Sequence, residues 1–191
     1  MKRFSFIMAL WMCCIFVNAQ AEQNNNSQSA QLEEKPFFTD QEALDFYSQR
    51  LKANSKDGEA YAWLARIWLD HEEYDKALNA ANAAIKYLPK EDTESLDFVY
   101  NTRALVYFYL DKENLAEIDS RKLLTSSNSQ YVQQGYLNIG IIQNNREQFD
   151  DAIATYTKLI NLYSDYAQVY KYRASTFFNS PSPPFSGAKA G

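Results

Sequence analysis

Apolar residues between positions 58 and 89 recur with the spacing of two successive helices. The first helix is predicted by a face with residues at i, i+3, i+4 and i+7, which are Tyr61, Leu64, Ala65 and Trp68. The second is predicted by the same kind of face at Ala77, Ala81, Ala84 and Ile85. A polar run over 70–75 separates the two faces, and Pro89 prevents the second helix from continuing. The segment therefore predicts an antiparallel helical hairpin.

The pattern returns in phase and predicts an array over 37–179. A second unit, over about 93–130, carries Tyr100, Arg103, Ala104 and Tyr107, then Ala116, Leu123 and Leu124. A third, over about 133–166, carries Tyr136, Ile139, Gly140, Phe149, Ala152, Tyr156, Leu159 and Ile160. A half unit over 167–179 supplies one helix, and the Pro- and Gly-rich tail 180–191 is predicted to be disordered. At the other end, Thr39 and Glu42 form a capping box that predicts a capping helix over 39–53.

The hairpin at 58–91 resembles the tetratricopeptide repeat (TPR). Residues at that family's signature positions are Tyr61, Leu64, Ala65, Trp68, Ala77, Ala81, Ala84 and Pro89. Tyr61 stands where the family usually has Trp, and Ala81 stands where it usually has an aromatic residue. The resemblance implies an all-α fold in which antiparallel helix hairpins stack into a right-handed superhelical solenoid. It also implies structural roles for Tyr61, Leu64, Ala65, Trp68, Ala77, Ala84, Pro89, Tyr100, Ala104, Ala116, Tyr136, Gly140, Ala152 and Tyr156, to which a comparison between the units adds Arg103 and Asp119.

Charged residues give an internal check on the alignment of the units. In the family's frame of 34 positions, Gly58 is position 1 of the first unit. Positions 7 and 23 of this frame lie at equal distances from the turn and should face each other. The second unit has Arg103 and Asp119 at these positions, whereas the first and third units have uncharged residues at both. We therefore expect an ion pair between Arg103 and Asp119. The half unit has Arg173 at position 7, and Lys189 falls where its partner would stand, so we expect that the reading frame or its ancestor continued with another helix.

The first 19 residues are typical of a secretory signal peptide. Lys2 and Arg3 precede an apolar run over 4–17, and small residues follow at 17–19. A transmembrane anchor is the alternative, but the run is shorter than the roughly 20 residues that span a bilayer. Lipoprotein processing at Cys13 is disfavoured because Met12 precedes it. We expect an exported protein, periplasmic or secreted, in which 20–36 is a flexible polar linker and no later segment spans a membrane.

Charge and residue types exclude several kinds of function. Loss of Lys2 and Arg3 leaves 17 basic against 24 acidic side chains, a net charge of −7, which would repel nucleic acid. His71 is the only histidine and falls in a predicted turn, and both cysteines lie in the leader, so no metal site is expected. The acidic pairs at 72–73 and 150–151 precede predicted second helices, where negative charge stabilises the helix terminus. We therefore expect no cofactor and no enzymatic activity.

The resemblance implies a concave groove lined by the first helices. Carried onto the second and third units, its groove positions give the candidate partner-binding residues Phe98, Asn101, Leu105, Phe108, Tyr109, Leu137, Ile141, Asn144 and Asn145. Aromatic side chains gathered on a surface are typical of peptide-docking sites, with asparagine available to bond a backbone. Packing of these aromatics between repeats is the alternative. The basic clamp that some family members use for carboxylate tails is not reproduced.

These observations predict an exported scaffold that binds a protein or peptide partner in the groove. The alternative is an envelope-associated structural or carbohydrate-handling accessory, in which the same aromatics stack on sugars. The unfinished last unit also predicts an exposed apolar end near Tyr170, Ala174 and Phe177, and hence self-association.

Overall fold

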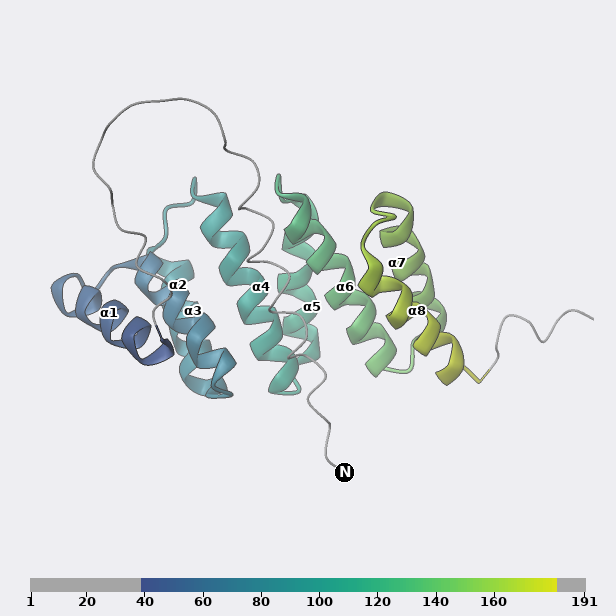
Figure 1. Ribbon diagram of the computed structural model, residues 1–191, viewed down its shortest axis with the longest axis horizontal. Helices are drawn as coiled ribbons and strands as arrows, with labels where there is room; N and C mark the ends of the chain where they lie inside the picture. The colour runs from purple at the N-terminus through teal and green to yellow at the C-terminus, as the bar shows by residue number, and fades with distance from the viewer. Residues whose placement is uncertain (1–38, 182–191) are drawn as a thin grey trace, which may run out of the picture. The chain divides into compact units, whose positions relative to one another are not determined.

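The computed structural model describes residues 39–181, and eight α-helices make up this part of the chain (Figure 1). They are α1 (Asp40–Ala53), α2 (Gly58–Asp70), α3 (Tyr74–Tyr87), α4 (Thr93–Tyr109), α5 (Glu113–Lys122), α6 (Ser129–Asn145), α7 (Phe149–Leu162) and α8 (Ala167–Asn179), with a short 3-10 turn η2 (Leu123–Thr125) after α5. The all-α prediction is confirmed. The predicted signal peptide and linker, and the tail beyond Pro181, lie outside the described residues.

Each helix packs against the next one in the chain, so that α2 with α3, α4 with α5, and α6 with α7 form antiparallel pairs (Figure 1). The first helices also form a continuous row, because α2 contacts α4, α4 contacts α6, and α6 contacts α8. Over residues 39–181 the second helices α3, α5 and α7 share no such contacts with one another. This arrangement is consistent with a repeat array in which the first helices form one layer.

The turns inside the three pairs have the same backbone structure. Glu72, Asp111 and Glu147 each adopt a positive φ, at 60°, 57° and 61°. In each turn this residue donates its N–H to a carbonyl three residues back, and the next residue donates to one five residues back, at 2.8 to 3.1 Å. This is the Schellman arrangement, which usually has glycine at the left-handed position. Three acidic residues in that position are a backbone repeat that the sequence pattern did not predict.

Side-chain caps mark the starts of four helices, among them α2, where Asp57 accepts from the backbone N–H of Ala60 at 2.9 Å. Thr39 and Glu42 form the expected capping box at α1. Asp92 accepts from the backbone N–H of Ser95 at 3.1 Å, which accounts for the longer α4. Asn128 accepts from Gln130 N–H at 3.0 Å, so α6 begins at Ser129. The expected start of the third unit near 133 was therefore late by about one turn.

Small residues bring the helices of each pair close together. Ala65, Ala77, Ala84, Ala104, Ala116 and Ala152 are all at most 2% exposed, and Leu64 is 6% exposed. Gly140 lies against the fully buried ring of Tyr156, and a Cβ at this position would come within 2.3 Å of its Cε1 atom. The remaining residues with predicted structural roles are partly buried at Tyr61, Trp68, Tyr100 and Tyr136, and exposed at Pro89. Pro89 therefore contributes by ending α3 rather than by packing.

The predicted ion pair between Arg103 and Asp119 is confirmed. Arg103 Nε and Nη2 donate to the two carboxylate oxygens of Asp119 at 2.6 and 3.0 Å, and Asp119 is 1% exposed. Lys122 also contacts Asp119, at 2.9 Å, and Arg103 Nη1 donates to Asn82 of α3 at 2.7 Å. Burial lowers the pKa of Arg103, but the bonds to Asp119 outweigh this and raise it. Arg103 therefore connects α3, α4 and α5.

Replacing Arg103 with Met should lower the free energy of unfolding by about 2 to 4 kcal/mol, because Asp119 would remain buried with only Lys122 as a partner. Arg173 is the matched control, since it occupies the same repeat position in α8 but donates to Thr157 at 3.3 Å. Arg173→Met should cost less than about 1 kcal/mol. Urea denaturation of both variants measures the difference, and equal losses would contradict the assigned role of the Arg103 pair.

Candidate functional site

The predicted positions on α4 share one partly exposed face of this helix. Phe98, Asn101, Leu105, Phe108 and Tyr109 are all half-buried, whereas Val99, Thr102, Ala104 and Val106 of the same helix are buried. Because α4 lies between α2 and α6 in the row of first helices, its partly exposed face is flanked by both. We call the face formed by these five residues, with Ile141, Asn144 and Asn145 of α6, the α4–α6 face.

Packing holds the aromatic residues of this face in fixed orientations. Tyr109 stacks on Tyr74 of α3, with ring centroids 5.0 Å apart and an interplanar angle of 14°, and Phe108 meets Tyr109 edge to face at 6.1 Å. Leu105 packs beside the buried cluster of Leu69, Ala77 and Val106. These residues therefore pack partly between the helices and remain partly exposed. Each of the two alternatives that the sequence left open, a docking surface and packing between repeats, holds in part.

The predicted positions on α6 differ in exposure. Leu137 is 1% exposed and packs with Ala152, Tyr156, Leu159 and Val169, so its expected place on an open groove is wrong. The cause is packing against α7, which contributes Ala152, Tyr156 and Leu159 to the same cluster, together with Val169 of α8. Ile141 is half-buried beside this cluster.

The asparagine side chains of the face are largely engaged. Asn138 Nδ2 donates to Asn101 Oδ1 at 3.2 Å and so bridges α6 and α4. Asn145 is exposed and donates to Glu113 of α5. Asn144 differs, because its Oδ1 is buried and has no donor among residues 39–181. A buried acceptor without a partner costs roughly 1 to 3 kcal/mol, so Asn144 is the amide of this face with unused bonding capacity.

A second aromatic surface was not predicted from the sequence. Four rings, which we call the aromatic strip, form a chain of contacts across α1, α2 and α4: Phe46, Tyr47, Trp63 and Phe98. Tyr47 and Trp63 stack at 6.0 Å and 10°, and Trp63 lies 5.1 Å from Phe98. Phe46 and Trp63 remain 43% and 41% exposed. One signal in the sequence could have indicated this surface: Trp63 is a large aromatic residue that lies off the apolar stripe of its predicted helix.

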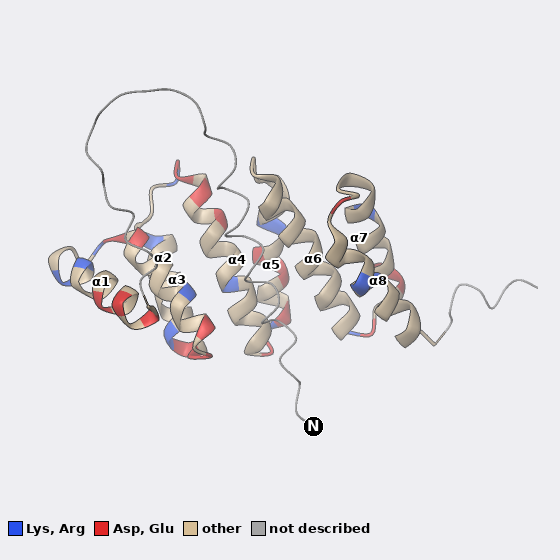
Figure 2. Ribbon diagram, in the orientation of Figure 1, with Lys and Arg blue, Asp and Glu red and all other residues tan. Residues whose placement is uncertain are grey.

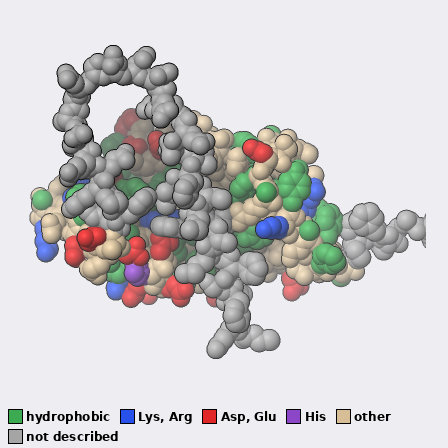
Figure 3. Space-filling model, viewed as in Figure 1, with side chains coloured by type: hydrophobic (Ala, Val, Ile, Leu, Met, Phe, Trp, Pro, Cys, Tyr) green, Lys and Arg blue, Asp and Glu red, His purple; other side chains and the backbone are tan. Residues whose placement is uncertain are grey.

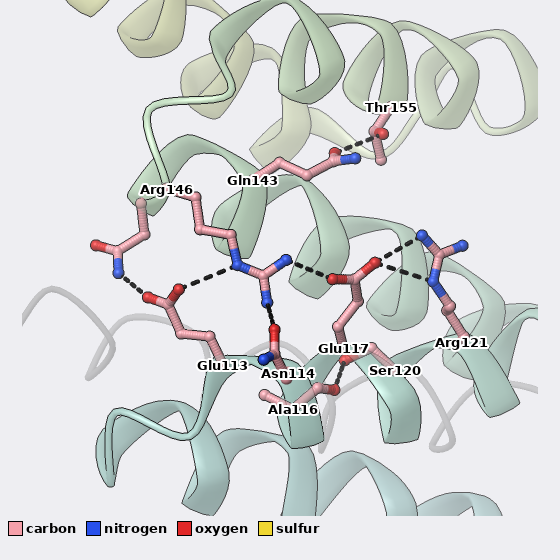
Figure 4. A network of polar contacts seen from close by, with 10 residues as sticks. Glu113, Asn114, Ala116, Glu117, Ser120, Arg121, Gln143, Arg146 and Thr155 are labelled. Atoms are coloured by element: carbon pink, nitrogen blue, oxygen red, sulfur yellow. Dashed lines mark hydrogen bonds and ion pairs between the residues drawn. The ribbon is translucent and has the colours of Figure 1, made fainter.

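A polar network surrounds Arg146, which follows α6 (Figure 4). Its guanidinium contacts Glu113, Glu117 and Asn114 of α5 at 3.2, 2.6 and 2.8 Å. Burial raises the pKa of Glu117, but bonds from Arg121 and Arg146 outweigh this and lower it. Each carboxylate here is paired with a fixed cation, so the network fastens the turn after α6 to α5 and is not arranged for proton transfer.

Other residues considered for chemistry lie at helix ends. His71 follows α2, and its Nε2 lies 3.2 Å from Asp40 Oδ2 of α1. The acidic pairs at 72–73 and 150–151 are exposed and lie at or beside the starts of α3 and α7. Over the described range, no cluster of three His, Cys, Asp or Glu side chains is arranged to hold a metal ion.

The last helix presents apolar side chains to solvent. Phe178 is 92% exposed, Tyr170 39% and Leu162 of α7 54%, whereas Phe177 is half-buried. Figure 3 shows hydrophobic side chains gathered on the part of the molecule that holds α7 and α8, and Figure 2 shows that basic and acidic residues also lie there. Self-association through this end stays a prediction.

No protein-family model matches the chain, and no curated protein matches it. None of the helices in the described part of the chain has the length and apolar character needed to cross a bilayer.

The hydroxyl of Tyr109 is the most strongly perturbed group on the α4–α6 face. Burial is the main cause, and the nearby Tyr74, Glu72 and Tyr172 add to it, so that the pKa of Tyr109 is raised to about 12. A raised phenol pKa favours the folded state below the ordinary value near 10, and this contribution is lost as the pH rises from about 10 through 12.

Tyr109→Phe keeps the ring on Tyr74 but removes the ionisable hydroxyl. Between pH 9 and pH 11 the variant should lose about 0.5 to 1 kcal/mol less stability than the unmodified protein, after allowance for solvent screening at this partly exposed site. Urea denaturation at the two pH values measures the loss. The same loss in both proteins would show that Tyr109 ionises as freely in the folded state as in the unfolded chain.

Proposed function

We propose that this protein is an exported scaffold that binds a polypeptide partner on the α4–α6 face of a TPR-like array. The observation that carries the proposal is the continuous row α2, α4, α6 and α8, in which the middle helices present a half-buried apolar and amide face. In a stack whose first helices touch and whose second helices do not, the first helices line the inner side. This is the side on which a solenoid binds extended partners.

The side chains of the face suit a polypeptide. Leu105 and Phe108 offer half-buried apolar surface next to the stacked rings of Tyr74 and Tyr109, so a partner would meet a surface already ordered by packing. Prior ordering reduces the entropy lost on binding. The exposed amide of Asn145, which carries both a donor and an acceptor, suits the N–H and C=O groups that a peptide backbone presents in regular succession. Apolar contacts with one or two directed hydrogen bonds are the usual composition of a peptide-binding surface.

Export and the absence of enzymatic chemistry belong to the same proposal. They rest on the leader at 1–19 and on the residue types of the chain. A scaffold needs no nucleophile, metal or cofactor, and the paired carboxylates around Arg146 serve to hold helices together.

Site-specific photo-crosslinking tests the proposed face. A photoreactive phenylalanine analogue at Phe108 should give one dominant protein adduct in cells that produce this chain, and mass spectrometry identifies it. The control is the same analogue at Ile118 on α5, which is 54% exposed but lies outside the row of first helices. Leu105→Glu should abolish the adduct from position 108, because it places a charge in the apolar part of the face.

Similar adducts from positions 108 and 118, or an adduct from 108 that survives Leu105→Glu, would contradict the proposal. An adduct to glycan alone would replace it with the carbohydrate-handling alternative.

A further inference from the structure

The aromatic strip has the properties of a stacking platform. Trp63 is fixed by contacts with Tyr47 on α1 and Phe98 on α4, yet 41% of it remains exposed, and Phe46 at the end of the strip is 43% exposed. Rings that are already ordered lose little entropy when a ligand stacks on them. Rows of exposed aromatic side chains recognise proline-rich segments, because the polyproline II conformation presents flat pyrrolidine rings and needs little ordering.

The chain itself contains a segment of that composition. Pro181, Pro183 and Pro184 are three of its five prolines, and Phe185 follows them directly. Residues 182–191 contain Lys189 and no acidic side chain, whereas the whole chain has a formal net charge of −5. Composition and charge therefore make this segment complementary to the body of the protein.

We propose that the aromatic strip of one copy binds the proline-rich segment 181–185 of a second copy. This inference rests on the proposed function, because it takes the row of first helices to be a polypeptide-binding layer. It adds a second site on that layer, at the α1 side of the α4–α6 face, and it assigns its ligand.

The reach of the chain favours a second copy over the same molecule. The row places α8 three helix positions away from α2, and packed helices lie about 8 to 10 Å apart. Along the row, Trp63 on α2 is therefore roughly 24 to 30 Å from α8 and Phe98 on α4 roughly 16 to 20 Å. The three residue-to-residue steps from Pro181 to Pro184 span at most about 11 Å. Binding between copies would be heterologous, with the tail of one molecule on the strip of the next, and such contacts form rings or open chains.

Sedimentation velocity of the full-length protein over a range of concentrations tests the proposal. We expect concentration-dependent association that shifts at least tenfold to higher concentration in either of two single-site variants, Trp63→Ala and Phe46→Ser. A full-length variant with Pro183→Ser, Pro184→Ser and Phe185→Ser should show the same shift. A synthetic peptide of residues 179–191 should dissociate the assembly of the unmodified protein, and the peptide with the same three substitutions should not.

Phe178→Ser is the matched control, because Phe178 is an exposed aromatic residue outside the strip. Under this proposal its association equals that of the unmodified protein, whereas self-association through the exposed end of α8 would make it fall. Circular dichroism should show unchanged helix content in every variant. Phe46→Ser keeps the test decisive if Trp63→Ala fails to fold, because Phe46 lies at the end of the strip and contacts one of its rings, whereas Trp63 contacts two.

Three outcomes would overturn the inference: a monomer at all concentrations, association unaffected by the strip and tail variants, or association lost only in Phe178→Ser. The last would assign self-association to the uncovered end of α8. None of them would affect the adduct formed from Phe108, so failure of this inference is distinguishable from failure of the proposed function.

Discussion

The buried carboxylate of Asp119 sets the strictest requirement in this structure. A charge that is 1% exposed needs a fixed partner, and Arg103 supplies two bonds from the neighbouring helix of the pair. The same guanidinium reaches Asn82 in the preceding pair. Because one side of α4 is held in this way, its rotation is fixed, and Leu105 and Phe108 are directed away from α5. The proposed binding face therefore depends on an ion pair that lies beneath it.

Arginines serve as connectors at the other junctions as well. Arg50 of α1 bonds Asp57 and Glu59 at 2.8 Å, which fastens the first helix to the start of α2. Arg146 fastens the turn after α6 to α5 (Figure 4). A bidentate guanidinium fixes both distance and direction, which the stacking of helices through small residues such as alanine does not. The combination allows closely packed pairs to keep a definite orientation relative to one another.

The sequence predicted the hairpins well because their apolar faces have a regular helical period and the turn residues lie between them. It also predicted the pair Arg103 and Asp119, since both stand at matched positions of one hairpin. Contacts between hairpins were not predictable in the same way. Arg146 follows the first helix of the third unit, whereas its partners Glu113 and Glu117 lie on the second helix of the second unit. No spacing rule relates positions in different units.

The candidate site shows the same limit. Leu137 has the position of a groove residue in its own helix, but α7 and α8 together bury it, and the extent of such burial depends on how neighbouring helices are placed. The aromatic strip combines side chains from three helices and is visible only when α1, α2 and α4 are placed together. Exposure on a single helix can be inferred from its period, whereas exposure in a stack depends on the neighbouring helices.

We infer that the helix pairs form an array in which each pair is coupled only to its neighbours. Hydrogen exchange of the full-length protein, measured by mass spectrometry for the unmodified chain and for Arg146→Met, tests this most directly. We expect faster exchange in α5, α6 and α7 and unchanged exchange in α1 and α2, because the lost contacts join the second and third pairs only. Equal acceleration in all eight described helices would show a single cooperative unit and contradict the array.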